Sequence, residues 1–254
     1  MRIKVLDHGY LEPIESWGSD ERIVEAARMS TGKGFLGWGP VDCPQCAHPA
    51  TGEPMAPDCS KCNGAGAVPG DEKLLRFLSE NHHDTPFEFA GLVIEVQAPI
   101  MVFREWHRHR TQSYNEMSAR YTPLPDVNYL PTPDRCLMVG GKNKQAGKVN
   151  DANELTHEGV LEWLEELSQV YVHAEAVYQN GLKRGIPKEL ARLPVPVGRY
   201  SRMRASTCLR NWLAFLTLRS APTAQWEIRQ YADEVGRLIA VRFPRTWELF
   251  ERGR

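Results

Sequence analysis

The order of the elements that the sequence predicts indicates an α+β fold. Residues 87–98 alternate apolar and polar side chains, which is typical of a half-buried strand. Residues 155–181, 207–219 and 222–241 instead carry apolar side chains at helical spacing. The strands and helices do not alternate regularly along the chain, as they would in a doubly wound α/β protein.

Local signals place the remaining elements in order. Ser19 and Asp20 are candidate N-caps of a helix, and residues 31–70 combine frequent Gly and Pro with no apolar periodicity, which indicates an inserted lobe. The aromatic residues Trp212, Phe215, Trp226 and Tyr231 recur at helical spacing and are expected in the core. The other predicted elements are a strand in 1–11, a helix from Ser19 or Asp20 to about Ser30, a helix over 71–78, a helix after Pro99, a loop over 121–147, a helix over 188–193 and a strand over 197–204.

The composition is that of an ordinary globular protein. Its 254 residues are 42% hydrophobic and 25% charged, and we expect one domain, residues 1–254, that carries the insert 31–70. The 31 Lys and Arg residues nearly balance the 32 Asp and Glu residues, so no global field favours nucleic acid or an anionic membrane as a partner. No apolar run approaches the roughly 20 residues that span a bilayer, and residues 1–10 lack the apolar segment of a signal peptide. We therefore expect a cytoplasmic protein whose six cysteines are not a disulfide framework.

The insert carries two C-x-x-C pairs separated by twelve residues. Each pair can form a knuckle whose two thiolates meet one metal ion, and two knuckles complete a tetrahedron. The segment has almost no apolar core of its own, so a bound metal is the expected cause of its folding. Four thiolates leave no open coordination position, which favours structural zinc over a catalytic metal, with bound iron, a redox dithiol or free thiols as the alternatives. The predicted ligands are Cys43, Cys46, Cys59 and Cys62.

The stretch Arg104–Tyr121, R-E-W-H-R-H-R-T-Q-S-Y-N-E-M-S-A-R-Y, is the main candidate for a functional site. It uses Arg rather than Lys throughout, and the planar fork of Arg suits bidentate contact with phosphate. Arg104 and Arg108 are four residues apart and would share a helix face, whereas His109 and Arg110 would point elsewhere. The alternative is a structural network of ion pairs or an exposed basic helix.

The chain resembles the flavin-dependent thymidylate synthases. The residues Arg108-His109-Arg110, followed by seven residues and Ser118, match the signature of that family within R-H-R-x-x-S-Y-N-E-x-S-x-R-Y. The resemblance covers nearly the whole chain outside residues 31–70 and about 135–155. Other matching segments are 27–30 (A-R-M-S), 83–88 (H-D-T-P-F-E), 98–100 (A-P-I), 191–192 (A-R), 211–219 (ending L-x-L-R) and 224–227 (A-Q-W-E).

The resemblance implies a homotetramer with a sheet flanked by helices and with FAD bound between subunits. It implies methylation of dUMP at C5 to dTMP, in which methylenetetrahydrofolate supplies the carbon unit and NADPH reduces the flavin. The site residues that it implies fall into three sets. The cofactor residues are Thr85, Arg108, His109, Arg110, Glu116 and Arg210; the nucleotide residues are Glu105, Arg108, Ser118, Arg120, Arg192 and Arg219; the catalytic residues are Arg219, Ser118 and His83.

The chemistry of these residues agrees with that expectation. A uracil carbon is a poor nucleophile, so a guanidinium that stabilises negative charge on the ring, as expected of Arg219, is what the reaction requires. Outside the insert the chain has only Cys136 and Cys208, and neither has an evident neighbouring base that would activate it. A mechanism without a nucleophilic cysteine therefore fits this chain.

Several positions depart from the pattern of the family. Glu105 stands where the family usually has Gln, and a carboxylate cannot donate a hydrogen bond as an amide does. Phe89, Cys208, Ala214 and Thr223 also replace polar residues of the family. These departures leave open a related pyrimidine nucleotide, including a cytosine base, or a product that is 5-hydroxymethylated rather than methylated. A zinc-containing nucleic-acid-binding protein is the alternative from another class, and the near-neutral charge argues against it.

Overall fold

The computed structural model describes residues 2–46, 56, 58–138 and 155–253. The chain forms two compact units, each assembled from several segments of the sequence. We call the first the sheet unit (Met1–Glu15, Val93–Thr207 and Ala214–Gly236) and the second the lobe unit (Ser16–Leu92, Cys208–Leu213 and Arg237–Arg254). Strands and helices are mixed along the chain without regular alternation, which confirms the α+β class.

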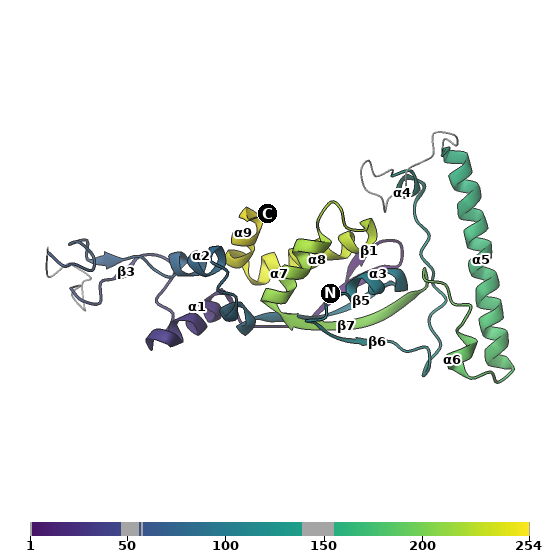
Figure 1. Ribbon diagram of the computed structural model, residues 1–254, viewed down its shortest axis with the longest axis horizontal. Helices are drawn as coiled ribbons and strands as arrows, with labels where there is room; N and C mark the ends of the chain where they lie inside the picture. Colours follow the sequence, from purple (N-terminus) through teal and green to yellow (C-terminus); the bar gives the residue numbers. More distant parts are fainter. Residues whose placement is uncertain (1, 47–55, 57, 139–154, 254) are drawn as a thin grey trace. The chain divides into compact units, whose positions relative to one another are not determined.

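The frame of the sheet unit, among the residues described, is a five-stranded sheet in the order β1-β2-β5-β7-β6 (Figure 1). β1 pairs antiparallel with β2, and β6 pairs antiparallel with β7, with Ser113 opposite Ser206. Leu92, Ile94 and Val96 of β5 are buried while the residues between them are half-buried, which confirms the predicted alternation. The strands are β1 (Ile3–Val5), β2 (Gly9–Trp17), β5 (Gly91–Pro99), β6 (Ser113–Glu116) and β7 (Tyr200–Cys208).

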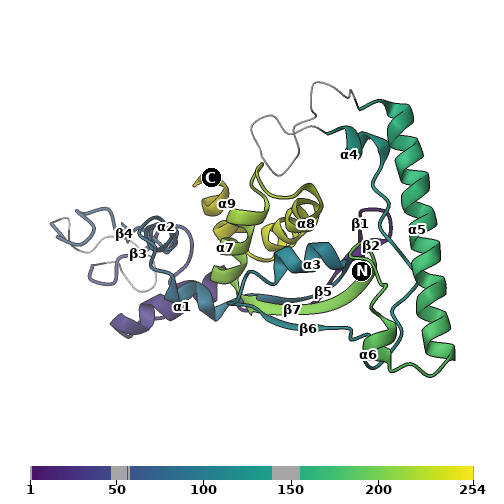
Figure 2. The ribbon, with the colours of Figure 1, turned by 45° about the vertical axis from the view of Figure 1, so that its right-hand side comes forward.

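Helices α3 (Ile100–Trp106) and α8 (Trp226–Arg242) lie on one face of this sheet (Figure 2). The fully buried indole of Trp106 stacks on Phe215 of α7 (Leu209–Arg219), with 4.8 Å between ring centroids. Tyr231 of α8 meets Trp106 edge-on at 6.3 Å and donates a hydrogen bond to the carbonyl oxygen of Gln97 at 2.8 Å. Gly9 allows this approach, since a Cβ there would lie 2.0 Å from the Tyr231 hydroxyl.

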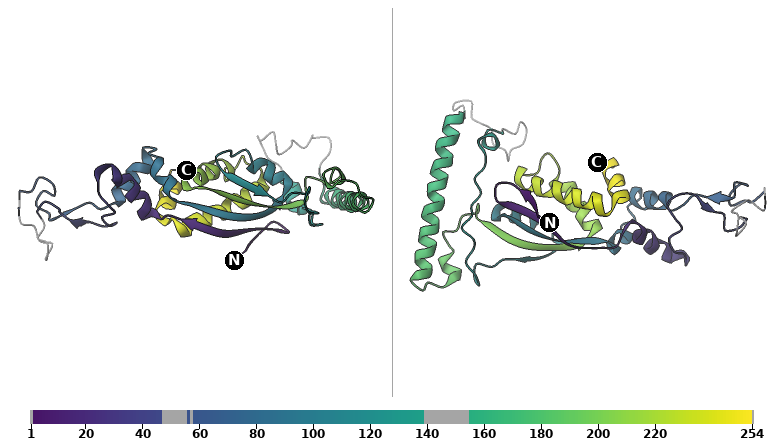
Figure 3. Two further views of the ribbon diagram at one scale, coloured as in Figure 1. Left: turned by 90° about the horizontal axis from the view of Figure 1, so that it is seen from below. Right: turned by 180° about the vertical axis from the view of Figure 1, so that it is seen from behind.

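The long helix α5 (His157–Lys183) stands beside the sheet, with α4 (Pro133–Leu137) near its first end and α6 (Lys188–Ala191) near its last (Figure 3). The Thr156 side chain caps α5 by accepting a hydrogen bond from the backbone N–H of Gly159 at 3.0 Å. Fully buried Arg199 donates to the carboxylate of Glu175 at 2.6 Å and to the carbonyl oxygen of Pro125 at 3.0 Å. These contacts join α5 to the segment that precedes β7.

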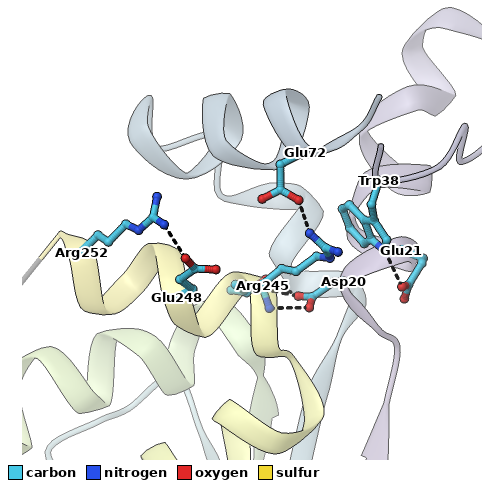
Figure 4. Close-up of polar contacts among 8 residues, drawn as sticks. Asp20, Glu21, Trp38, Glu72, Arg245, Glu248 and Arg252 are labelled. Carbon is cyan, nitrogen blue, oxygen red and sulfur yellow. Dashed lines mark hydrogen bonds and ion pairs between the residues drawn. The ribbon is translucent and has the colours of Figure 1, made fainter. Parts of the chain in front are cut away.

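The lobe unit is organised around the buried carboxylate of Asp20, at the start of α1 (Asp20–Arg28). This carboxylate accepts hydrogen bonds from the backbone N–H groups of Arg245 (2.9 Å) and Thr246 (3.2 Å) in α9 (Pro244–Arg252), so one helix caps another (Figure 4). The Arg245 guanidinium lies 4.3 Å from the ring centre of Trp38 and pairs with Glu72 of α2 (Glu72–Glu80). Two 3-10 helices, η1 (Met29–Thr31) and η2 (Thr85–Phe89), also belong to this unit.

The insert is part of the lobe unit, and its two ends lie beside a group of polar contacts around Asp71. The fully buried carboxylate of Asp71 accepts hydrogen bonds from the Arg28 guanidinium at 2.6 Å and from the backbone N–H of Leu36 at 2.6 Å. Beyond these contacts, β3 (Val41–Asp42) and β4 (Ala67–Val68) form a short antiparallel hairpin. The predicted insert 31–70 therefore begins and ends beside one ion pair.

The structure corrects several predicted element boundaries. The helix after Pro99 ends at Trp106, so Arg104 and Arg108 do not share a helix face as predicted. Residues 113–116 form β6, which the sequence analysis missed. The strand predicted to start at residue 87 starts at Gly91, because Pro86 favours the 3-10 helix η2. At the other end of the chain, the last predicted helix is followed by a separate helix, α9. Part of the predicted loop 121–147 is helix α4, and residues 139–154 lie outside the described residues.

Within the described part of the chain, no helix combines the length and the apolar character that a membrane span requires.

Candidate active site

The stretch Arg104–Tyr121 contains the end of α3, a turn and the strand β6. Backbone hydrogen bonds from His109 to Trp106 (3.0 Å) and from Gln112 to His109 (3.2 Å) close the turn that follows α3. The Tyr114 hydroxyl donates to the carbonyl oxygen of His109 at 2.7 Å, which fixes β6 against this turn. Arg104, Arg108 and Arg110 are exposed, and the site residues Glu105 and His109 are half-buried. The turn therefore exposes three arginine side chains to solvent, while the neighbouring Trp106 is buried.

Arg219, the last residue of α7, meets this turn. Its Nη1 donates to the Glu105 carboxylate at 2.7 Å, its Nη2 to the Glu105 carbonyl oxygen at 2.8 Å, and its Nε to Nε2 of His109 at 2.9 Å. The Arg219 side chain is 15% exposed and that of Glu105 39%. The structure thus brings together three predicted site residues from two helices and a turn.

His109 is a neutral acceptor in this arrangement. Burial, with a smaller contribution from the Arg219 charge, lowers the pKa of His109 to about 4. Because Nε2 accepts from Arg219, its proton is held on Nδ1. The ring of Phe215 meets the imidazole edge-on at 4.9 Å and limits its movement.

A second group of predicted residues surrounds a pocket of about 340 Å³ in the sheet unit. Glu116 and Arg192 line this pocket together with Met117 and Ser201. Arg120 lies nearby in the chain, and its guanidinium pairs with Glu189 of α6 at 3.7 Å. Among the residues that line the pocket, Arg192 is the cation and Glu116 the anion, and most of the others are apolar.

Ser118 opens the turn that carries Arg120. Its hydroxyl accepts a hydrogen bond from the backbone N–H of Arg120 at 3.3 Å, and its carbonyl oxygen accepts from Tyr121 at 3.0 Å. Lys188 donates to the carbonyl oxygen of Tyr121 at 2.8 Å and so ties this turn to α6. Lys188 and Glu189 were not predicted as site residues. Their only signal in the sequence is their position just before Ala191-Arg192.

Three predicted site residues, His83, Thr85 and Arg210, belong to the lobe unit. Arg210 pairs with Asp84 at 3.3 Å and with Glu88 at 2.7 Å, which places its guanidinium beside η2 and hence near Thr85. His83 and Thr85 are both exposed, and the His83 imidazole meets the Phe77 ring at 5.3 Å. The sequence analysis missed Asp84 and Glu88 as partners of Arg210, although both lie in the motif H-D-T-P-F-E.

The four cysteines of the insert come together as predicted. Their sulfur atoms all lie within 4.8 Å of one another, and all four residues are buried. Cys43 and Cys59 are 3.8 Å apart between sulfurs, close to the roughly 3.8 Å edge of a tetrahedron with Zn–S bonds of about 2.3 Å. Each C-x-x-C closes as a tight turn, and the positive φ angles of Asn63 (51°) and Gly64 (76°) complete the second turn. The donor set and its spacing fit one metal ion.

The lowered pKa of His109 predicts a dependence of stability on pH. The unfolded imidazole has an ordinary pKa of 6.5, so between pH 6.5 and about 4 the unfolded chain binds more protons here than the folded protein does. The free energy of unfolding should therefore fall as the pH decreases through this window. His109→Gln keeps an acceptor but does not titrate, so its melting temperature should fall less across the window than that of the parent.

The control for this measurement is His8→Gln, at an exposed histidine. Its melting temperature should follow that of the parent at each pH. Parallel curves for the parent and His109→Gln would show that His109 carries no linked proton.

Comparisons with known proteins identify the family of the chain. The family model described as thymidylate synthase complementing protein (Thy1) matches residues 13–245. The chain is 34% identical over 251 residues to a flavin-dependent thymidylate synthase of Thermus thermophilus, covering 99% of this chain and 78% of that protein. It is 34% identical over 250 residues to the enzyme of the same name from Thermosipho africanus, covering 98% and 94%.

A solved structure with a similar fold also comes from a pyrimidine nucleotide methylase. The UMP/dUMP methylase PolB from Streptomyces cacaoi, bound to 5-Br dUMP, superposes with a TM-score of 0.73 at 29% identity and covers 98% of this chain and 97% of its own. The same methylase bound to 5-Br UMP gives a TM-score of 0.72. The family match, the relatives and the fold together show that this chain belongs to the thymidylate synthase complementing protein family, the family of the flavin-dependent thymidylate synthases.

Proposed function

We propose that this chain is a flavin-dependent thymidylate synthase that methylates dUMP at C5 to give dTMP. The observation that carries the proposal is the membership in this family over residues 13–245. The contacts of Arg219 and the pocket that Arg192 lines support it. The relatives are named flavin-dependent thymidylate synthases, and the similar solved structure is titled a UMP/dUMP methylase. Methylenetetrahydrofolate and NADPH are the co-substrates in this proposal.

The nucleotide residues have the chemistry that a nucleoside monophosphate needs. A phosphate monoester carries close to two negative charges, and Arg108, Arg120 and Arg192 can neutralise it through charge-assisted hydrogen bonds, with Ser118 as a further donor. Arg120 is paired with Glu189 at an exposed position, where an ion pair is worth only about 0–1 kcal/mol. The phosphate can therefore replace this carboxylate at little cost.

The cofactor residues fit FAD by their charge and exposure. FAD carries a diphosphate, and the exposed guanidinium groups of Arg108, Arg110 and Arg210 are cationic donors that match it. Thr85 and His109 would add neutral hydrogen-bonding groups to the FAD site. The Glu116 carboxylate would accept hydrogen bonds from N–H or O–H groups of FAD rather than contact its diphosphate. FAD, when bound, supplies the hydride that reduces the transferred carbon unit.

The proposed role of Arg219 is to stabilise negative charge on the uracil ring. Its guanidinium is half-buried, where an electrostatic contact is stronger than in bulk water. His83, exposed on the lobe unit, is proposed to lie near the meeting point of folate and base. Burial raises the pKa of the half-buried Cys136 thiol, which makes it a poor nucleophile and supports a mechanism without a cysteine.

Product mass tests the proposal directly. Purified protein should be yellow with bound flavin and should convert dUMP, with methylenetetrahydrofolate and NADPH, to a product heavier by one methyl group. Arg219→Ala should lower kcat by about 10²-fold or more while flavin absorbance is retained. Arg204→Ala, at an exposed arginine paired with Glu95, is the control and should keep parental kcat.

Other outcomes of this assay identify the alternatives. A product heavier by a hydroxymethyl group would identify the hydroxymethylase that the departures at Glu105 and Cys208 leave open. Assays with UMP and dCMP in place of dUMP define the base and the sugar, since the similar solved structure is titled a methylase of both UMP and dUMP. Colourless protein that binds no FAD and retards DNA would overturn the proposal in favour of a nucleic-acid-binding protein.

The proposal includes a structural zinc ion on Cys43, Cys46, Cys59 and Cys62. The backbone N–H groups of Lys61 and Cys62 lower the pKa of the Cys59 thiol, which favours the thiolate that zinc requires. The described part of the insert buries little besides these cysteines and the apolar residues Ala56 and Val68 that pack on them. A metal ion is therefore the main source of stability for the hairpin β3–β4.

Elemental analysis tests the zinc site. Purified protein should contain zinc in a stoichiometric amount, and the double variant Cys59→Ser/Cys62→Ser should lose it and show protease cleavage within residues 31–70. Cys136→Ser, outside the insert, should keep the full zinc content. Equal zinc content in the parent and the double variant would refute the site.

We also propose a homotetramer in the cytoplasm. Trp163, Val170 and Val177 recur every seven residues on α5 and are 48%, 58% and 45% exposed, which leaves an apolar stripe for a second copy to cover. Light scattering should give the mass of four chains, and a monomeric mass at assay concentration would exclude the tetramer.

A further inference from the structure

The guanidinium of Arg219 is held from three directions by two residues. Glu105 accepts from Nη1 through its carboxylate at 2.7 Å and from Nη2 through its own carbonyl oxygen at 2.8 Å, and His109 accepts from Nε at 2.9 Å. Contacts at Nε and at both terminal nitrogens fix the plane of the group, because a guanidinium is rigid and planar. The described contacts leave further N–H donors of the same guanidinium for a ligand.

The Glu105 carbonyl oxygen can accept a hydrogen bond from Arg219 because α3 ends at Trp106. Glu105 lies in the last turn of α3, where carbonyl oxygens have no partner within the helix. The N–H of His109 bonds to the carbonyl of Trp106, so the carbonyl of Glu105 is left to Arg219. A cation at this end of a helix is also favoured by the helix dipole.

The two holding residues are themselves fixed by the core. Trp106, between Glu105 and the turn, is fully buried, and its indole N–H donates to Gln112 at 3.1 Å. His109 is held by the Tyr114 hydroxyl through its carbonyl oxygen and by the Phe215 ring against its imidazole. Arg219 is therefore bound to a rigid support rather than to mobile surface side chains.

We propose that Glu105 and His109 are positioning residues: they hold the guanidinium plane of Arg219 in the orientation in which it contacts the pyrimidine ring of the nucleotide. This inference rests on the proposed function for the identity of the ligand. The Glu105 carboxylate also balances the Arg219 charge, so Arg219 acts through directed N–H donors rather than as an unpaired cation. A glutamine at position 105 would keep the acceptor and remove the charge, which separates position from charge in an experiment.

The first test compares Glu105→Ala with Glu105→Gln. Glu105→Ala should lower kcat for dUMP at least tenfold with unchanged flavin absorbance and melting temperature, and Glu105→Gln should restore most of that loss because its amide oxygen still accepts from Nη1. Glu12→Ala, which removes the exposed carboxylate paired with Arg2, is the matched control and should keep parental kcat. Equal losses in Glu105→Ala and Glu105→Gln would overturn the positioning role, as would parental kcat in Glu105→Ala.

The second test asks whether Glu105 acts through Arg219. In an Arg219→Ala background, Glu105→Ala should cause no further loss of kcat, since its effect depends on that guanidinium. Additive losses would show that Glu105 acts independently of Arg219 and would contradict the inference.

The third test needs no turnover and distinguishes this inference from the proposed function. Phenylglyoxal modifies accessible arginines, and peptide mass analysis should show Arg219 to be protected in the parent, more reactive in Glu105→Ala and again protected in Glu105→Gln. Loss of methylation by the parent protein would reject the proposed function and leave this result unaffected. Equal modification of Arg219 in the parent and Glu105→Ala would reject the positioning role.

Discussion

The buried indole of Trp106 is the contact on which the candidate active site depends. It stacks on Phe215 of α7 and meets Tyr231 of α8, so the end of α3 is fixed against two other helices. Its neighbour Glu105 and the turn to His109 are placed by this one residue, and the stack on Phe215 places Arg219 one turn further along α7. A large aromatic contact in the core thus sets the geometry of three polar groups whose own bonds are individually modest.

Two buried carboxylates organise the polar contacts of the lobe unit. Asp20 and Asp71 are buried carboxylates that accept hydrogen bonds from helix and insert backbone, and Arg28 and Arg245 supply the nearby cations. Removing one partner of the buried pair Arg28–Asp71 would leave an uncompensated charge, which is strongly destabilising. This pair therefore stabilises the two ends of the insert. The hairpin beyond it buries its four cysteines and little else, and these cysteines form a group that could hold a metal ion.

Three cations of the proposed site are paired with carboxylates in the described structure. Arg219 is paired with Glu105, Arg120 with Glu189, and Arg210 with Asp84 and Glu88. This pairing explains how a chain of net charge −1 can carry a dense group of arginines. The exposed pairs are weak and can give way to phosphate, whereas the half-buried pair of Arg219 is geometrically fixed and suits a positioning role.

The sequence by itself determined the α+β class, the helix cap at Ser19, three of the four predicted core aromatics and the four-cysteine cluster, because these depend on short-range periodicity and spacing. Trp212, Phe215 and Tyr231 are buried, whereas Trp226, also predicted in the core, is half-buried at the start of α8. The resemblance of the chain to the flavin-dependent thymidylate synthases also predicted the family whose model matches residues 13–245. Only the tertiary structure showed that α3 stops at Trp106, that residues 113–116 form an edge strand, and that Arg219 rests on Glu105 and His109. These last contacts join residues about 110 positions apart, and contacts at that separation are decided by how helices pack on the sheet rather than by local pattern.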